Sequence, residues 1–293
     1  MSRAEHVLWA AQIACQLEIT ALKPGNVTWD RPFSDVAAEQ FLASSAAMGR
    51  SFSDLGRKRT GELILQAVMD TREVAGCNTN LGIALLLFPL AKAAIGGPTG
   101  ELRERLAMEL RLLTEKDTRD VYQAIRIASP GGLGGSDRYD VKEVPPSKPF
   151  LEAMAEARER DSVAREYVTD FEITFNTGLP AFDDSAKAGL SLRDAVTQTF
   201  LTILSRFPDT LIARKRGNED ASAVSVEASR VLGSGAAGSE KWRSSVLEFD
   251  SSLRDLANSF NPGTTADLTV AVLFCEVLKA LEEGTLPEML RKW

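Results

Sequence analysis

Histidine is nearly absent from this chain: its 293 residues include only His6. Zinc sites commonly use several imidazoles, and a Ser-His-Asp triad needs a histidine beside its nucleophile. A single histidine close to the N-terminus excludes a multi-histidine zinc site and a histidine-based triad within one chain. General acid–base chemistry is therefore expected from carboxylates, lysine, tyrosine or bound water.

Cysteine and long apolar runs are also scarce. The three cysteines, Cys15, Cys77 and Cys275, lack metal-ligand spacing, which predicts reduced thiols in a cytoplasmic protein. The longest apolar runs, 81–90 and 268–275, are shorter than the roughly 20 residues that cross a bilayer. The N-terminus shows no basic region followed by an apolar stretch, so neither a secretory signal nor a membrane partner is expected.

Positive charge does not dominate either. The formal net charge of -7 argues against a broad nucleic-acid-binding surface. An anionic substrate would need a metal ion or a local basic patch to offset this charge. Hydrophobic residues make up 44% of the chain, which is enough for a sizeable core.

Helical periodicity dominates what is present. Val7, Ala11 and Ala14 share one face of a first helix, and the segment from about Asn80 is apolar all round. Pro89 should kink or break that central helix. Strand signals are few, the clearest at 171–175 and an ambiguous one at 223–226. We predict one all-α domain over residues 1–293, a bundle of about ten helices with its site formed by loops at helix ends.

The first candidate site segment surrounds a Pro-Gly turn. Lys23, Gly25 and Asn26 place an ammonium next to free backbone amides, which predicts an anion cradle. Glu18 lies one turn earlier on the preceding helix. A solvated helix end explains the same pattern equally well.

Two further segments carry polar or small residues beside helices. Asn78, Thr79 and Asn80 begin the apolar helix, and one N-cap needs only one of them. Ser129, with Gly131 and Gly132, belongs to a glycine-rich stretch that follows a helix and lacks the Gly-Lys-Ser/Thr ending of a phosphate loop. A mobile lid or a helix stop is an equally good interpretation of that stretch.

The remaining two segments combine acidic and basic residues. Asp209 follows a proline, as an N-cap does, and Arg214 with Lys215 could bind phosphate oxygens or simply end a helix. Asp267 is expected in the first turn of the last long helix, where a capping role is as reasonable as a functional one. It is preceded by Asn261, Gly263, Thr264 and Thr265.

Taken in order, these motifs resemble the triphosphoribosyl-dephospho-CoA synthase family. They are Lys-Pro-Gly-Asn-Val, Asn-Thr-Asn-Leu-Gly, Ser-Pro-Gly-Gly-Leu-Gly, Pro-Asp-Thr-Leu-Ile-x-Arg-Lys-x-Gly and Asn-Pro-Gly-Thr-Thr-Ala-Asp-Leu, within about 18–275. The resemblance implies an all-helical enzyme that uses ATP and 3'-dephospho-CoA and releases adenine. Its product would be the prosthetic-group precursor for the acyl carrier protein of citrate lyase or malonate decarboxylase.

The chain departs from the family pattern at two places. Its members typically carry Gly-Ala-His-x-Asp-Met, whereas residues 31–36 here keep Asp35 without the histidine. Their Asn-Thr-His-Lys-Gly motif has Asn80 and Leu81 here in place of histidine and lysine. The sequence looks more like a divergent branch found beside one-carbon pathways that use methanopterin-like carriers.

The resemblance also implies roles for the candidate residues. Mg²⁺ held by Asp209 and Asp267 would bridge the triphosphate, with Glu18 and Asp35 as catalytic base or further ligands. The residues implied in nucleotide and phosphate binding are Lys23, Gly25, Asn26, Asn78, Thr79, Asn80, Ser129, Gly131, Gly132, Arg214, Lys215, Asn261, Gly263, Thr264 and Thr265.

Other functions fit the same residues. A magnesium-dependent hydrolase of an N-glycosidic bond would use water as its nucleophile, and an enzyme of a methanopterin-type pathway would use another acceptor. A non-catalytic nucleotide-binding protein is the third alternative. A homodimer is compatible with all of them.

Overall fold

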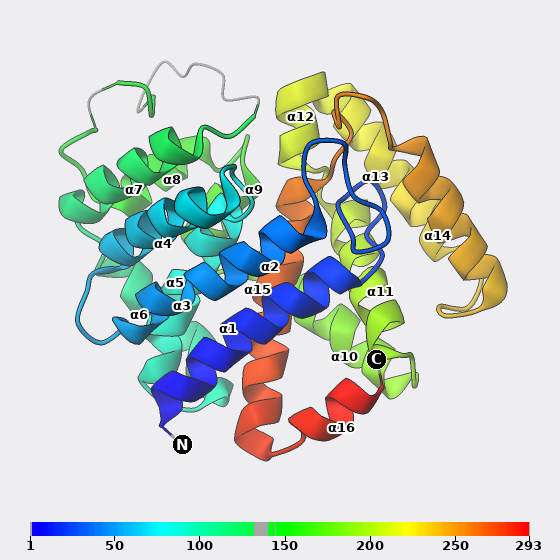
Figure 1. Cartoon of the computed structure of the whole chain (residues 1–293), viewed down its shortest axis with the longest axis horizontal. Coiled ribbons are helices and arrows are strands. Elements are labelled where there is room, and N and C mark those ends of the chain that lie inside the picture. Colours follow the sequence, from blue (N-terminus) through cyan, green and yellow to red (C-terminus); the bar gives the residue numbers. More distant parts are fainter. Residues whose placement is uncertain (1, 132–139, 144, 293) are drawn as a thin grey trace.

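The computed structural model describes residues 2–131, 140–143 and 145–292. Every named element in these ranges is a helix, which confirms the all-α prediction (Figure 1). The bounds are α1 (Arg3–Thr20), α2 (Ala38–Ala47), α3 (Gly49–Ser53), α4 (Thr60–Ala75), α5 (Leu81–Ile95), the 3-10 helix η1 (Thr99–Glu101), α6 (Leu102–Arg111), α7 (Glu115–Ala128), α8 (Phe150–Ala157), α9 (Ser162–Val168), the π-helix η2 (Thr174–Gly178), α10 (Leu179–Lys187), α11 (Leu192–Arg206), α12 (Thr210–Arg216), α13 (Asn218–Leu232), α14 (Glu240–Ser252), α15 (Gly263–Glu283) and α16 (Leu286–Arg291).

The described residues thus form more helices than the ten or so expected. The additional ones, such as α3, α9, α12 and α16, span only five to seven residues. Helices this short complete barely two turns, so no apolar periodicity marks them in the sequence. The ambiguous segment 223–226 lies inside α13.

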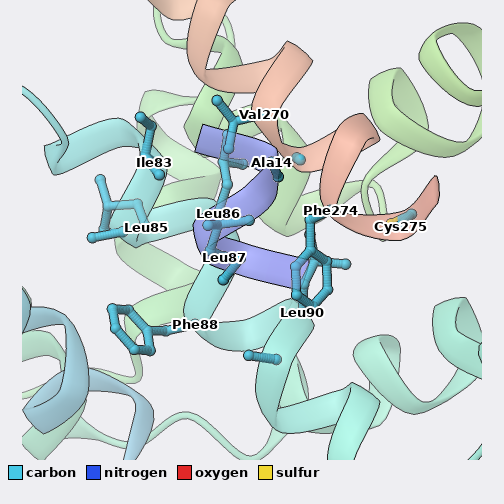
Figure 2. Close-up of a cluster of buried hydrophobic side chains, with 14 of the residues drawn as sticks. Ala14, Ile83, Leu85, Leu86, Leu87, Phe88, Leu90, Val270, Phe274 and Cys275 are labelled. Atoms are coloured by element: carbon cyan, nitrogen blue, oxygen red, sulfur yellow. The ribbon is translucent and has the colours of Figure 1, made fainter. Parts of the chain in front are cut away.

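The core forms where α1, α5 and α15 meet. Figure 2 shows Leu86 and Leu90 of α5 beside Phe274 of α15 and Ala14 of α1. All four side chains are fully buried. Burying a leucine or phenylalanine stabilises a fold by about 1.5–3 kcal/mol. The apolar character of α5 on all sides therefore reflects its central position, as predicted.

Pro89 does not break α5, so the break, one of the two outcomes expected from the sequence, is wrong. The helix runs from Leu81 to Ile95 through the proline. Because proline has no N–H, the carbonyl of Leu85 four residues earlier loses its helical partner. The buried hydroxyl of Tyr167 in α9 donates a hydrogen bond of 2.6 Å to that carbonyl. A side chain from another helix thus satisfies the group that the proline leaves free.

The predicted strand at 171–175 is wrong, because this segment begins the η2–α10 helix. The buried Glu166 carboxylate accepts hydrogen bonds from the amides of Ile173 and Thr174, at 2.9 and 2.8 Å, and from the Thr174 hydroxyl at 2.6 Å. These contacts start a helix as a side-chain cap would. Burial raises the pKa of Glu166 to about 7 despite these donors.

Among the described residues, no single helix combines the length and apolarity needed to cross a membrane. Only the pair 81–95 and 99–111 meets both criteria together, and it is bent by 118° at its break.

Candidate functional site

A single large cavity of about 910 Å³ draws together segments that are distant in the sequence. It lies where the end of α1 meets the starts of α5, α12 and α15. Most of the predicted site residues line it, namely Glu18, Asn26, Asp35, Asn78, Thr79, Asn80, Ser129, Gly131, Arg214, Lys215, Asn261, Gly263, Thr264 and Asp267. Gly132 lies outside the described residues.

Lys23 is not among the cavity residues, although it was expected to bind phosphate. Its side chain is fully buried, and its ammonium donates hydrogen bonds to the carbonyls of Glu18, Ala21 and Val27 at 2.7, 3.2 and 3.2 Å. It also forms an ion pair with Glu18 Oε1 at 3.2 Å. All three ammonium protons are therefore engaged inside the protein, and the phosphate role has no geometric support.

Gly25 also turns out to shape the loop instead of facing the cavity. Its φ of +77° is a conformation that favours glycine, and a Cβ there would lie 2.8 Å from Cβ of Leu253. Its amide donates to Oδ1 of the fully buried Asp250 at 2.8 Å. Asp250 also accepts hydrogen bonds from Arg254 and pairs with Arg31. Asp250 thus holds the Pro-Gly turn in place.

Asp209 is the second prediction that the geometry does not support. Oδ1 accepts from the amides of Leu211 and Ile212, as an N-cap of α12, at 2.8 and 3.1 Å. Oδ2 accepts from the amide and hydroxyl of Thr265 at 2.7 and 2.8 Å. Both oxygens are occupied and the side chain is buried, so Asp209 and Thr265 join α12 to α15 instead of facing the cavity.

Asp267 faces the cavity, but not as a helix cap. Because α15 begins at Gly263, Asp267 lies beyond its first turn. Its carboxylate packs against the start of α5, where a Cβ added to Gly82 would lie 1.9 Å from Oδ2. Burial raises the pKa of Asp267 well above its usual range, and the nearby charge of Glu18 raises it further. No described residue donates a hydrogen bond to it, which leaves its oxygens available to a ligand.

Glu18 approaches the same cavity from the end of α1. Its side chain is buried and its closest counter-ion is Lys23. Burial raises the pKa of Glu18, while the ammonium of Lys23 opposes the shift. The cavity therefore has two carboxylates in different settings, one paired inside the protein and one unpaired. Asp35 is an exposed residue at the cavity wall, where Asn258 donates a hydrogen bond of 3.1 Å to it.

The three polar residues before α5 have different hydrogen-bond partners. Asn80 is the N-cap residue, whereas Asn78 accepts from the amide of Leu81, the first residue of the helix, at 3.1 Å. The Thr79 hydroxyl pairs with that of Ser44 at 2.5 Å, and Asn80 donates to the Thr71 hydroxyl at 2.7 Å. These bonds fix the orientation of Thr79 and Asn80 where they line the cavity.

The basic side of the cavity is built on α12. Arg214 forms an ion pair of 2.6 Å with Asp161, which also caps α9. Lys215 donates to the carbonyl of Asn258 at 3.0 Å, and burial lowers the pKa of its ammonium. Asp161 was missed from the sequence, although its place before Ser162 is typical of an N-cap. Arg72 and Arg160, also missed, bring the cations of the described cavity wall to four.

An apolar wall that the sequence analysis did not identify completes the cavity. It comes from α7, α8 and α9, and its members are Tyr122, Ile125, Ala128, Phe150, Ala153, Met154, Ala157, Val163 and Ala164. Their helical spacing is indistinguishable from that of ordinary core residues.

A protein-built metal centre is not found in the described ranges, where no group of three or more His, Cys, Asp or Glu residues could hold a metal ion. Mg²⁺, however, is usually bound by one or two carboxylates together with substrate phosphates. The free oxygens of Asp267 and the nearby Glu18 fit that second kind of site.

Curated proteins with a named activity are similar to part of this sequence. Curated proteins named "Probable 2-(5''-triphosphoribosyl)-3'-dephosphocoenzyme-A synthase" from Pseudomonas aeruginosa and Pseudomonas paraeruginosa are 33% identical over 107 residues. The match spans 36% of this chain and 36% of each relative.

The fold has a solved counterpart from Archaeoglobus fulgidus, which carries the provisional name triphosphoribosyl-dephospho-CoA synthase. The two structures align with a TM-score of 0.64 at 29% identity, over 81% of this chain and 98% of the other. The sequence model of the ATP:dephospho-CoA triphosphoribosyl transferase family matches residues 4–285. The chain therefore belongs to the ATP:dephospho-CoA triphosphoribosyl transferase family.

Proposed function

We propose that this protein transfers the triphosphoribosyl group of ATP to a hydroxyl of 3'-dephospho-CoA and releases adenine. The observation that carries the proposal is the meeting of Glu18 and Asp267, from opposite ends of the sequence, at one cavity whose wall also holds Arg214 and Lys215. Family membership supplies the reaction class. The geometry supplies the charges that such a reaction needs.

The acceptor hydroxyl attacks the anomeric carbon of the ATP ribose, a C–O bond forms, and the bond to adenine breaks. The electron pair of that bond leaves with adenine, which takes up a proton from solvent. The hydroxyl proton passes to Glu18 and from there to solvent, so the protons balance. Glu18 suits this role better than the exposed Asp35, because a buried carboxylate is held in place and poorly hydrated.

The transition state carries positive charge on the ribose ring, which the nearby carboxylates stabilise. Arg214 and Lys215 bind the triphosphate from α12. Mg²⁺ bound by Asp267 and the phosphates would offset further negative charge when it enters with the nucleotide. Asn80 and Asn261, which line the cavity, orient the sugar and the base.

The test is incubation of the purified protein with ATP, Mg²⁺ and 3'-dephospho-CoA, with adenine followed by chromatography and the product by mass spectrometry. We expect adenine and a product heavier by one triphosphoribosyl group. Adenine from ATP alone would identify a hydrolase instead. A pterin-like acceptor, tested in parallel, examines the divergent-branch expectation, and no adenine with any acceptor would contradict transferase chemistry.

A further inference from the structure

The lysine of the first motif is buried behind the cavity, where it contacts Glu18 twice. Its ammonium lies 2.7 Å from the Glu18 carbonyl and 3.2 Å from its carboxylate oxygen. The backbone and the side chain of one residue are thus held by the same cation. We propose that Lys23 is a positioning residue, which fixes the side chain of Glu18 at the cavity wall. This inference rests on the proposed function, in which Glu18 accepts the acceptor's proton.

The end of α1 explains why a cation is placed there. The helix has no basic residue in its last turn, and its final carbonyls lack helical partners. Lys23, just before the Pro-Gly turn, reaches back to the carbonyls of Glu18 and Ala21, where a cation complements the helix dipole. Its third bond, to Val27, closes the loop after the turn. The position of Glu18 is therefore tied to the helix end and to the loop.

The surroundings of Lys23 make this arrangement rigid. Asp250, the other charge that favours the ammonium, holds the amide of Gly25 and the side chain of Arg254. Arg254 in turn donates to the carbonyl of Asn26 at 2.8 Å. A phosphate could reach Lys23 only if several of these buried bonds broke. Since buried ion pairs are often replaceable by apolar residues without loss of stability, stability alone does not explain the pair.

The two cavity carboxylates differ in whether an internal cation holds them. Asp267 has no cation within hydrogen-bonding distance among the described residues, whereas Glu18 has a dedicated one. A carboxylate held by an internal ammonium keeps its geometry when ligands enter. That property suits a base, which must meet the acceptor hydroxyl at hydrogen-bond distance.

The experiment compares Lys23→Met with Lys215→Met, which removes a cation of the proposed phosphate side. ATP affinity is measured by calorimetry without acceptor, and kcat by adenine release. We expect Lys23→Met to lower kcat by about 10- to 100-fold, the size of effect that a 1 Å displacement produces, with ATP affinity within a factor of two. Lys215→Met should do the reverse, weakening ATP binding more than kcat.

Lys23→Met leaves a buried carboxylate unpaired, so its fold is checked by circular dichroism and thermal melting. The double variant Lys23→Met/Glu18→Gln removes both charges and is expected to fold. It should match Glu18→Gln alone both in ATP affinity and in kcat, because Lys23 acts through Glu18. Weaker ATP binding in the double variant than in Glu18→Gln would overturn the inference in favour of a phosphate-binding lysine. An inactive wild-type protein that still binds ATP would instead count against the proposed function.

Discussion

Replacing Gly82 by alanine should separate stability from activity. An alanine inside a helix is usually more favourable than glycine by up to about 1 kcal/mol. Here the new Cβ would lie 1.9 Å from Oδ2 and 2.5 Å from Cγ of Asp267. Ordinary contact begins at 3.4 Å, so the carboxylate must move by about 1.5 Å, which is 3.4 minus 1.9. Displacements of 1 Å can lower a rate about 100-fold.

We therefore expect Gly82→Ala to fold, to melt within a few degrees of wild type, and to lose about 100-fold in kcat. Gly100→Ala is the matched control, because no atom lies within 4 Å of its Cβ. Combined with Asp267→Asn, Gly82→Ala should add little to the loss from Asp267→Asn alone. Wild-type activity in Gly82→Ala would refute the reasoning, since it would mean that the position of the Asp267 carboxylate does not matter.

Three further predictions concern single buried groups. Tyr167→Phe leaves the Leu85 carbonyl without a donor and should lower the free energy of unfolding by about 1–3 kcal/mol in urea denaturation; no change would mean that another group satisfies this carbonyl. Asp209→Asn should destabilise the fold by a similar amount but leave ATP affinity unchanged by calorimetry, whereas a loss of Mg²⁺-dependent binding would restore Asp209 as a metal ligand. Glu166 has a pKa raised to about 7, so between pH 4.5 and 7 the folded chain keeps a proton that the unfolded chain has lost, and its contribution to stability falls as pH rises. Glu276 adds a contribution of the same sign, and Glu166→Gln should flatten the decline measured by urea unfolding across this window.

The helical fold could be predicted because its signals are local. Apolar spacing along α1 and the apolar character of α5 on all sides indicate buried positions regardless of what packs against them. The expected break at Pro89 and the expected strand at 171–175 were wrong for the opposite reason. The helix continues through Pro89 because of a hydrogen bond from Tyr167, which is distant in the sequence. The segment 171–175 becomes helical with the help of the Glu166 carboxylate, whose spacing follows no helical rule. Both interactions exist only once the tertiary structure has formed.

The candidate site was predicted in part for a similar reason. Polar turns at helix ends indicated where ligands could bind, and most of those residues line the cavity. The sequence could not show which charged groups were already occupied. Lys23 and Asp209 are saturated by backbone groups, Asp209 in part by Thr265, 56 positions away. The apolar wall escaped notice because cavity-lining and core residues of a helix follow one pattern.

The bond between Asp209 and Thr265 has a mechanical consequence. The Asp209 carboxylate accepts hydrogen bonds from the first amides of α12 and from Thr265 in the first turn of α15. These bonds restrain the starts of the two helices to move together. Arg214 and Asp267 lie on these two helices, so the bond between Asp209 and Thr265 restrains the distance between them. The cavity wall formed by α7 and α8 is not held by this bond.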